Sequence, residues 1–285
     1  MTLPVTVGVD GSGAAERALG WAAVEAELRH LPLDIVHVGH LITVPPGEPP
    51  ATSMNADMAA RCRKLLDEAV SVVRTIAPEV SATTELVDDG VLDALSDKSS
   101  HSSLLVLGSR GSGGFAELLA GSVTVNLSAH ARCPVAVIRG GIADPHAPVV
   151  VGIDGSPTSD AALAFAMDEA ALRSVPLIAY HVWNDTSFEP GVQNQPFVLD
   201  WDAIRDAEEQ VLAERLAGWP VRYPEVEIRR VVERDRPARG LVRQSARAQL
   251  VVVGSRGRGG LAGMLLGSTS HALIHHAACP VIVAR

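Results

Sequence analysis

The sequence predicts an α/β protein built from two tandem domains, each with a five-stranded parallel sheet and helices on both faces. The first observation is a long internal repeat: VTVGVDGSG at residues 5–13 returns as VVVGIDGSP at 149–157, and a glycine-rich stretch at 105–124 returns at 251–269. The copies lie 144 residues apart at their starts and 146 apart from the glycine stretch onward, which is the period of a whole domain. Short β-branched runs also alternate with helical stretches, as a parallel sheet with right-handed crossovers requires.

Each element of the first copy follows from a local pattern. The β-branched run at residues 5–9 is typical of a fully buried strand, and helical spacing of apolar residues begins after the turn residues 10–13. Prolines mark residues 42–55 as a loop, and Pro78 ends a long amphipathic helix. The predicted strands are residues 5–9, 33–38, 80–87, 104–107 and 135–138, and the predicted helices are residues 14–29, 57–76, 91–100 and 122–131.

The second copy repeats this order of elements. The segment 139–147, RGGIADPHA, has the Gly and Pro content of a linker. We therefore expect a first domain at residues 1–140, a linker at 141–147 and a second domain at 148–285, held close together by the short linker. In the second domain the expected strands are residues 149–153, 177–182, 226–232, 250–253 and 281–284, and the expected helices are residues 158–173, 200–217, 237–248 and 268–277.

Composition and charge narrow the class of protein. Apolar residues make up 47% of the chain and charged residues 20%, a globular composition. No apolar run is long enough for a membrane span and the N-terminus lacks the pattern of a secretory signal, so we expect a cytoplasmic protein. The net charge of -9, with only two lysines, leaves little attraction for nucleic acid or anionic lipid.

The three cysteines have no close spacing, which argues against a disulfide framework or a zinc cluster. Cys133 and Cys279 each precede a proline and an apolar run, so we expect both to be buried. His271 and His275 have the i, i+4 spacing of a metal pair, but no third ligand is evident nearby and a metal site there is not expected.

The most distinctive motifs converge on one place. In a sheet of order 3-2-1-4-5 the ligand crevice lies beyond the carboxyl ends of strands 1 and 4. Strand 1 ends in Val-Asp-Gly-Ser or Ile-Asp-Gly-Ser, and strand 4 ends in Gly-Ser-Arg-Gly. A shared spacing, Gly-x2-Gly-x9-Gly-Ser, then leads to a helix, and such a loop suits phosphate. Its members are Gly108, Gly111, Gly121 and Ser122, and then Gly254, Gly257, Gly267 and Ser268.

Other features of the loops are open to two interpretations. The glycines also fit a purely structural turn, and we expect Ser122 and Ser268 to be helix N-caps, a role that leaves amide donors free. Arg110, Arg256 and Arg258 suit phosphate oxygens but equally suit solvent. The usual P-loop, the dinucleotide fingerprint and the hydrolase nucleophile elbow are excluded because their Gly-Lys-Ser/Thr, third glycine and Gly-x-Ser-x-Gly are missing.

Asp10 and Asp154 end the first strand of each copy. One interpretation is that they cap the next helix or form an Asx-turn. The other is that they accept hydrogen bonds from a nucleoside or hold a phosphate-bound Mg²⁺, with Gly8 and Gly152 letting the ligand approach the backbone. Asp185 is placed like the acidic residue that holds ribose in other nucleotide folds.

Together these features resemble the universal stress protein family, in its tandem-domain form and its ATP-binding branch. The resemblance covers nearly the whole chain: VGVDGS and VGIDGS, LVLGSRG and VVVGSRG, the glycine spacing, and CPVAVI and CPVIVA. It implies a Rossmann-like or flavodoxin-like domain of the adenine nucleotide alpha hydrolase type, with domains paired through the fifth strand, in one chain or between chains as a homodimer.

The resemblance also implies one ATP site per domain, in which Val38 or Val182 meets the nucleoside and the glycine loop meets ribose and phosphates. The first site is expected at Gly8, Asp10, Val38, Gly108, Ser109, Arg110, Gly111, Ser112, Gly113, Gly114, Gly121, Ser122 and Val123. The second is expected at Gly152, Asp154, Val182, Asp185, Gly254, Ser255, Arg256, Gly257, Arg258, Gly259, Gly260, Gly267, Ser268, Thr269 and Ser270.

Two departures from the family pattern fall in the first copy. Ser112 replaces the basic residue seen at Arg258, and Glu117 replaces the small residue seen at Gly263. A carboxylate near phosphates weakens binding, so the second site is expected to be the stronger.

The sequence thus predicts a regulatory protein of the stress response that binds ATP together with Mg²⁺. Any turnover of ATP should be slow, because no activated nucleophile or general base is evident. The alternatives are an ATP-dependent ligase or phosphotransferase on the same fold, and a dimerisation module whose loops bind nothing.

Overall fold

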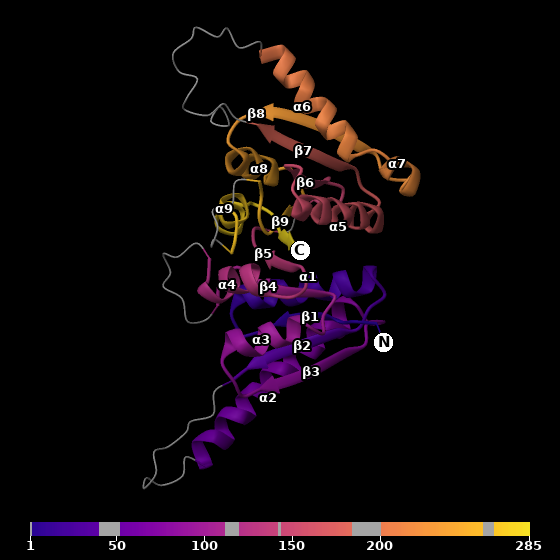
Figure 1. Ribbon diagram of the computed structural model, residues 1–285. Helices are drawn as coiled ribbons and strands as arrows, with labels where there is room; N and C mark the ends of the chain where they lie inside the picture. The colour runs from indigo at the N-terminus through magenta and orange to yellow at the C-terminus, as the bar shows by residue number, and fades with distance from the viewer. Residues whose placement is uncertain (1, 40–51, 112–119, 142–143, 184–200, 259–264) are drawn as a thin grey trace, which may run out of the picture. The chain divides into compact units, whose positions relative to one another are not determined.

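The computed structural model describes residues 2–39, 52–111, 120–141, 144–183, 201–258 and 265–285 (Figure 1). The chain divides into two compact units, Met1–Arg139 and Gly140–Arg285. Strands and helices alternate along both units, so the expected α/β class is confirmed. The segment expected as a linker, 141–147, falls within the second unit.

The first unit contains one parallel sheet of order β3-β2-β1-β4-β5, which is the expected order. Helices α1 and α2 pack together on one face of the sheet, and α3 and α4 pack together on the other. The strands are β1 (Val5–Gly8), β2 (Leu33–Val38), β3 (Ala82–Val87), β4 (Leu104–Gly108) and β5 (Val135–Ile138). The helices are α1 (Gly13–Leu28), α2 (Thr52–Ile76), α3 (Val91–Ser99) and α4 (Ser122–His130).

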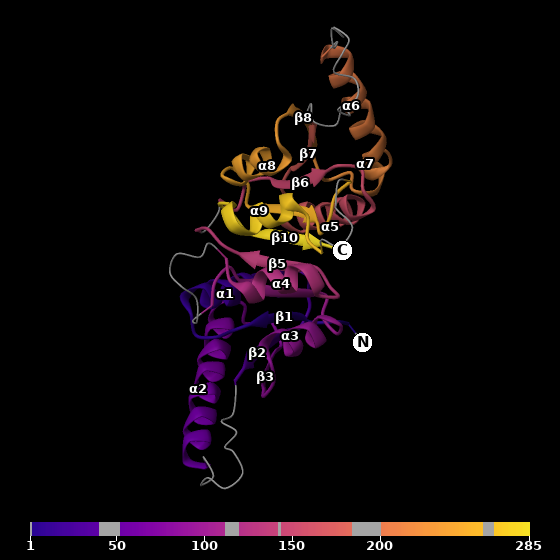
Figure 2. The ribbon, with the colours of Figure 1, turned by 60° about the vertical axis from the view of Figure 1, so that its left-hand side comes forward.

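The second unit repeats this arrangement with the parallel order β8-β7-β6-β9-β10. Helices α5 and α6 cover one face, and α8 and α9 cover the other (Figure 2). The strands are β6 (Val149–Ile153), β7 (Leu177–Trp183), β8 (Ile228–Arg234), β9 (Leu250–Gly254) and β10 (Val281–Ala284). The helices are α5 (Pro157–Arg173), α6 (Trp201–Arg215), α7 (Trp219–Arg222), α8 (Pro237–Ser245) and α9 (Ser268–His276).

Burial explains why the central strands read as unbroken apolar runs. Helices cover both faces of each sheet, so β4 and β9 are buried along nearly their whole length. The edge strands β3 and β8 expose several side chains. Cys133 and Cys279 are buried, as expected, and Cys62 is buried too.

Several boundaries differ from the sequence prediction. Helix α2 begins at Thr52 and not at residue 57, because Pro50 is the last helix-breaking residue before it. Strand β8 begins two residues late, since the Val226 N–H bonds to the Tyr223 carbonyl in a turn and the sheet ladder starts at Glu227. The single-turn helix α7 was not predicted, being too short for periodicity to reveal.

Among the helices of the described residues, none has both the length and the apolar character needed to cross a lipid bilayer.

Candidate functional site

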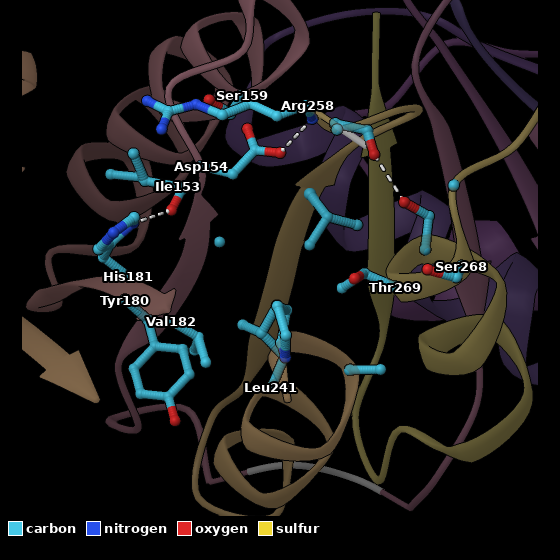
Figure 3. A pocket seen from close by; sticks show the side chains of 18 of the residues that line it. Ile153, Asp154, Ser159, Tyr180, His181, Val182, Leu241, Arg258, Ser268 and Thr269 are labelled. Atoms are coloured by element: carbon cyan, nitrogen blue, oxygen red, sulfur yellow. Dashed lines mark hydrogen bonds between the residues drawn. The ribbon is translucent and has the colours of Figure 1, made fainter. Parts of the chain in front are cut away.

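A cavity of about 570 Å³ opens in the second unit beyond the carboxyl ends of β6 and β9 (Figure 3). Strand β6 lies between β7 and β9, so this is the topological switch point where the sequence places a ligand. The end of β7, the first turns of α8 and α9, and one residue of α6 complete the walls. The lining residues that the sequence predicted are Gly152, Asp154, Val182, Gly254, Arg256, Gly257, Arg258, Gly267, Ser268, Thr269 and Ser270.

Asp154 joins the two loops that frame the cavity. Its Oδ1 accepts hydrogen bonds from the Ser156 N–H at 2.9 Å and the Ser156 hydroxyl at 2.6 Å, and its Oδ2 accepts one from the Arg258 N–H at 3.0 Å. Partial burial acts to raise the pKa of the Asp154 carboxyl, but these hydrogen bonds outweigh it and hold the pKa below its ordinary value. Asp154 is therefore a carboxylate at neutral pH.

The Asx-turn interpretation of the two aspartates is confirmed, and the helix-cap interpretation is wrong. Asp10 Oδ1 accepts a hydrogen bond from the Ser12 N–H at 3.0 Å, the same i to i+2 bond that Asp154 makes. The helix caps are the serines two residues later. Ser12 Oγ accepts from the Ala15 N–H and Ser156 Oγ accepts from the Ser159 N–H.

The expected caps of the later helices are also wrong. The N-caps of α4 and α9 are Gly121 and Gly267, without a side-chain cap bond, and Ser122 and Ser268 are the first helical residues. Both glycines adopt the extended conformation that an N-cap needs, so each serine moves one position into the helix. Ser268 is exposed, and the first amides of α9 receive no cap from it.

Packing explains most of the repeated glycines without any ligand. A Cβ on Gly254 would lie 2.7 Å from the Thr158 carbonyl, and one on Gly108 would lie 2.8 Å from the Ala14 carbonyl, so the fourth strands pass directly under the first helices. A Cβ on Gly152 would lie 2.9 Å from Leu241 Cδ1, and one on Gly257 would meet the Asp154 carboxylate.

Two buried hydroxyls form hydrogen bonds with the carbonyl groups at which the loops begin. Ser270 Oγ donates to the Gly254 carbonyl at 2.7 Å, and Thr124 Oγ1 donates to the Gly108 carbonyl at 2.9 Å. Ser255 and Ser109 are also buried, and their carbonyls accept from Gly267 and Gly121 at 2.8 Å. Ser255 does not line the cavity, so of the predicted hydroxyl residues Ser268 and Thr269 are the ones whose side chains are accessible at its rim.

A histidine and a glutamate that were not predicted from the sequence, His181 and Glu208, form part of the cavity wall. His181 is 4% exposed, and its Nδ1 lies 2.7 Å from the Ile153 carbonyl oxygen and its Nε2 lies 2.8 Å from Glu208 Oε2. A carbonyl only accepts, so Nδ1 donates the first bond. The repeat held a signal, because His37 stands at the equivalent position and its Nδ1 lies 2.7 Å from the Val9 carbonyl oxygen.

Tyr180 contributes a second unpredicted group. Its ring is 1% exposed, and its hydroxyl donates to Glu233 while Arg243 Nη2 lies 3.4 Å from the hydroxyl oxygen. Burial, followed by the bond to Glu233, raises the pKa of Tyr180 to about 12. The phenol thus stays protonated at neutral pH and offers no base for a reaction.

The predicted residues of the first unit occupy the matching positions. Gly8 ends β1, Val38 ends β2, and a Cβ on Gly111 would lie 2.8 Å from Asp10 Oδ2. Arg110 is exposed, as are Arg256 and Arg258 in the second unit. Other predicted site or contrast residues lie outside the described residues: Ser112, Gly113, Gly114, Glu117, Asp185, Gly259, Gly260 and Gly263.

The rings of His271 and His275 lie 4.5 Å apart between their centroids. Within the described ranges, no group of three or more His, Cys, Asp or Glu residues is arranged to hold a metal ion.

Comparison with known proteins identifies the family. The universal stress protein family matches residues 1–139 and again residues 146–285, so the chain belongs to this family in its tandem form. Universal stress protein Rv2005c of Mycobacterium tuberculosis is 48% identical over 295 residues, which cover 99% of this chain and 96% of that protein. The family and the tandem-domain form that the sequence resembles are thereby confirmed.

A solved structure shares the fold over nearly the whole chain. A universal stress protein from Archaeoglobus fulgidus DSM 4304 aligns with a TM-score of 0.68 and 20% identity, covering 99% of this chain and 96% of that one. A smaller universal stress protein from Archaeoglobus fulgidus, solved in complex with dAMP, aligns with 26% identity and a TM-score of 0.36, covering 48% of this chain and 98% of that one.

Proposed function

We propose that this universal stress protein binds ATP in the second-domain cavity and serves as a cytoplasmic, nucleotide-responsive regulator of the stress response. The observation that carries the proposal is that hydroxyl groups and apolar side chains stand on different sides of the cavity. Ser268 and Thr269 stand with the uncapped first turn of α9 on one side, and Ile153, Val182 and Leu241 stand on the other (Figure 3).

Each side suits one part of a nucleotide. Free amides and the positive end of the α9 dipole attract phosphate oxygens, and the two hydroxyls supply further donors. The apolar side chains and His181 suit a nucleoside, whose base buries more easily than its phosphates. An equivalent, weaker site is proposed in the first domain, where Ser122 and Val123 begin α4.

Mg²⁺ fits this site as a companion of the phosphates. Magnesium in nucleotide sites keeps several waters and takes one or two carboxylates together with phosphate oxygens. Asp154 is the carboxylate that would hold it, directly or through water, since its lowered pKa keeps it charged.

The described wall gives no support for rapid ATP chemistry. His181 is occupied by Ile153 and Glu208, and Tyr180 is held protonated, so neither stands ready as a base toward an attacking group. We therefore propose a binding role with at most slow hydrolysis.

Pairing through the fifth strands is part of the same proposal. Strands β5 and β10 have the uncharged sequences VAVI and VIVA, which suit strand pairing between domains or between chains. Analytical ultracentrifugation of the wild-type chain would give the oligomeric state, and a monomer at all concentrations would exclude a homodimer.

The decisive test places a negative charge where the phosphates are expected. In Ser268→Asp the carboxylate stands at the start of α9, where it favours the helix dipole and leaves the fold intact. It should nevertheless weaken ATP binding by about 100-fold, because like charges a few ångströms apart repel strongly. Isothermal titration calorimetry would measure this, with the first-domain site disabled by Ser122→Asp.

Ser268→Ala is the matched control, since it leaves the helix amides free and should cost no more than about tenfold in affinity. Adenosine, which lacks phosphates, should bind Ser268→Asp as well as it binds the wild type. Unchanged ATP affinity in folded Ser268→Asp would overturn the site assignment, and a wild type that binds no ATP would favour a dimerisation module.

A further inference from the structure

An aromatic assembly stands at the cavity edge where β7 ends. Trp183 lines the cavity and is half-buried, and its ring stacks on that of Trp201 with the centroids 6.0 Å apart and the planes inclined by 27°. The Arg234 guanidinium carbon lies 3.7 Å from the Trp201 ring centroid and 5.8 Å from that of Trp183. Three elements, β7, α6 and β8, thus meet at one cation–π cluster.

The fold fixes the position of this cluster. Strands β7 and β8 pair with Trp183 opposite Arg234, which brings the cation beside the indole. Side chains alternate along a strand, so Trp183 lies on the same face of the sheet as His181, whose ring is held by Ile153 and by Glu208 of α6. The Trp183 ring is itself packed against Trp201 and Arg234, so it loses little freedom when a ligand binds against it.

The first domain has no counterpart to this cluster at the equivalent positions. Gly39 follows Val38 where Trp183 follows Val182, and Asp88 follows β3 where Arg234 ends β8. A Cβ on Gly39 would lie 3.3 Å from Cys62 Sγ and 3.5 Å from Leu86 Cδ1, so that position leaves little space for a larger side chain. The aromatic cluster is therefore a property of the second-domain cavity.

We propose that Trp183 is the face against which the second domain stacks the flat heteroaromatic base of its nucleotide, and that Trp201 and Arg234 position Trp183. This inference rests on the proposed nucleotide-binding function and deepens it. The base lies toward Trp183 at the β7 end, while the phosphates lie toward Ser268 at the start of α9, with the sugar between them. Stacking accepts any base, so Trp183 selects nucleotides over phosphates that carry no base.

Affinity measurements on two ligands test the role of Trp183. In the Ser122→Asp background, Trp183→Ala should weaken ATP binding about tenfold by calorimetry, the effect of losing one base–aromatic stack. Inorganic tripolyphosphate, which has no base, should bind as in the parent. Trp183→Phe keeps a flat ring and should stay within about threefold of the parent for ATP.

Tryptophan fluorescence gives a second readout that does not depend on affinity. ATP at saturation should quench the emission of the parent and of Trp219→Phe, the control, because Trp219 lies in α7 and does not line the cavity. The quenching should disappear in Trp183→Phe. For the positioning residue, Arg234→Lys should keep ATP affinity nearer the parent than Arg234→Gln does, with tripolyphosphate binding equal in both.

Equal ATP affinity in folded Trp183→Ala and the parent would overturn the inference, as would equal losses of ATP and tripolyphosphate. Full quenching in Trp183→Phe would overturn it as well. A parent that binds no ATP would instead remove the proposed function on which the inference rests, so the two failures are distinguishable.

Discussion

The two domains share a scaffold and differ at the rim of the site. Each places a serine cap, Ser12 or Ser156, at the first helix, and a histidine, His37 or His181, against the end of the first strand. Each also ties a hydroxyl to the carbonyl that ends the fourth strand. The repeated glycine motif thus describes how the loops pack, and it leaves the choice of ligand to residues outside it.

The rim differs at the residues that approach the histidine and the end of the second strand. In the second domain Glu208 bonds to His181 Nε2 and Trp183 stands next along β7. In the first domain the residue 146 positions before Glu208 is Cys62, whose Sγ lies beside Gly39. The duplication has thus kept the loop after the fourth strand alike in the two domains, while the edge at the end of the second strand has diverged.

The largest effect is expected where both domains depend on the same packing. Gly254→Ala and Gly108→Ala force a methyl group against the backbone of the first helix of the same domain, at Thr158 or Ala14, so each should lower the free energy of unfolding by about 2–3 kcal/mol. Urea denaturation measures this. Gly141→Ala is the control, because a Cβ there meets nothing within 4 Å; equal stability of all three variants would show that the motif glycines are not scaffold.

Removing the Glu208 carboxylate should destabilise the protein more than truncating Cys62 at the equivalent position of the first domain. Glu208→Ala leaves the buried His181 Nε2 without its partner and should cost about 2 kcal/mol in the free energy of unfolding. Glu208→Gln should restore most of it, since an amide can also bond to the ring nitrogen. A loss no larger than that of Cys62→Ala, about 1 kcal/mol for a small buried side chain, would contradict the contrast.

Replacing the serine caps should change the free energy of unfolding by similar amounts in the two domains. Ser12→Ala loses a cap bond worth about 1 kcal/mol, and Ser156→Ala loses a cap bond together with the hydroxyl that donates to Asp154, so it should cost somewhat more. Thermal unfolding of the two variants side by side checks the order. The reverse order would mean that the Asp154 bond contributes nothing to stability.

Features set by residues close in the sequence could be predicted, whereas contacts between distant elements could not. Apolar runs and the repeat identified the strands, and glycine spacing located the loops beside Asp154. Spacing alone could not tell whether Gly267 or Ser268 caps α9, because both residue types suit an N-cap. The Glu208 and Trp201 contacts were out of reach, since they depend on which face of α6 packs against β7.

The smallest expected effect is the loss of stability that Asp154 causes at acid pH. The pKa of Asp154 is lowered in the folded chain, so its carboxylate stabilises the fold above its ordinary pKa of about 4, and this contribution is lost as the pH falls through the folded value. Asp154→Asn should therefore lose less stability than the wild type between neutral pH and pH values below that range. Parallel pH profiles in urea would contradict this.

Calorimetric titration of ATP into Ser122→Asp and into Ser268→Asp would show which domain holds the principal nucleotide site, because each variant places a negative charge where the phosphates are proposed to bind in one domain and leaves the other domain unchanged. We expect Ser122→Asp to retain the tighter ATP binding and Ser268→Asp to lose it. Tighter binding retained in Ser268→Asp, or identical titrations of the two variants, would contradict the assignment of the second domain as the principal nucleotide site.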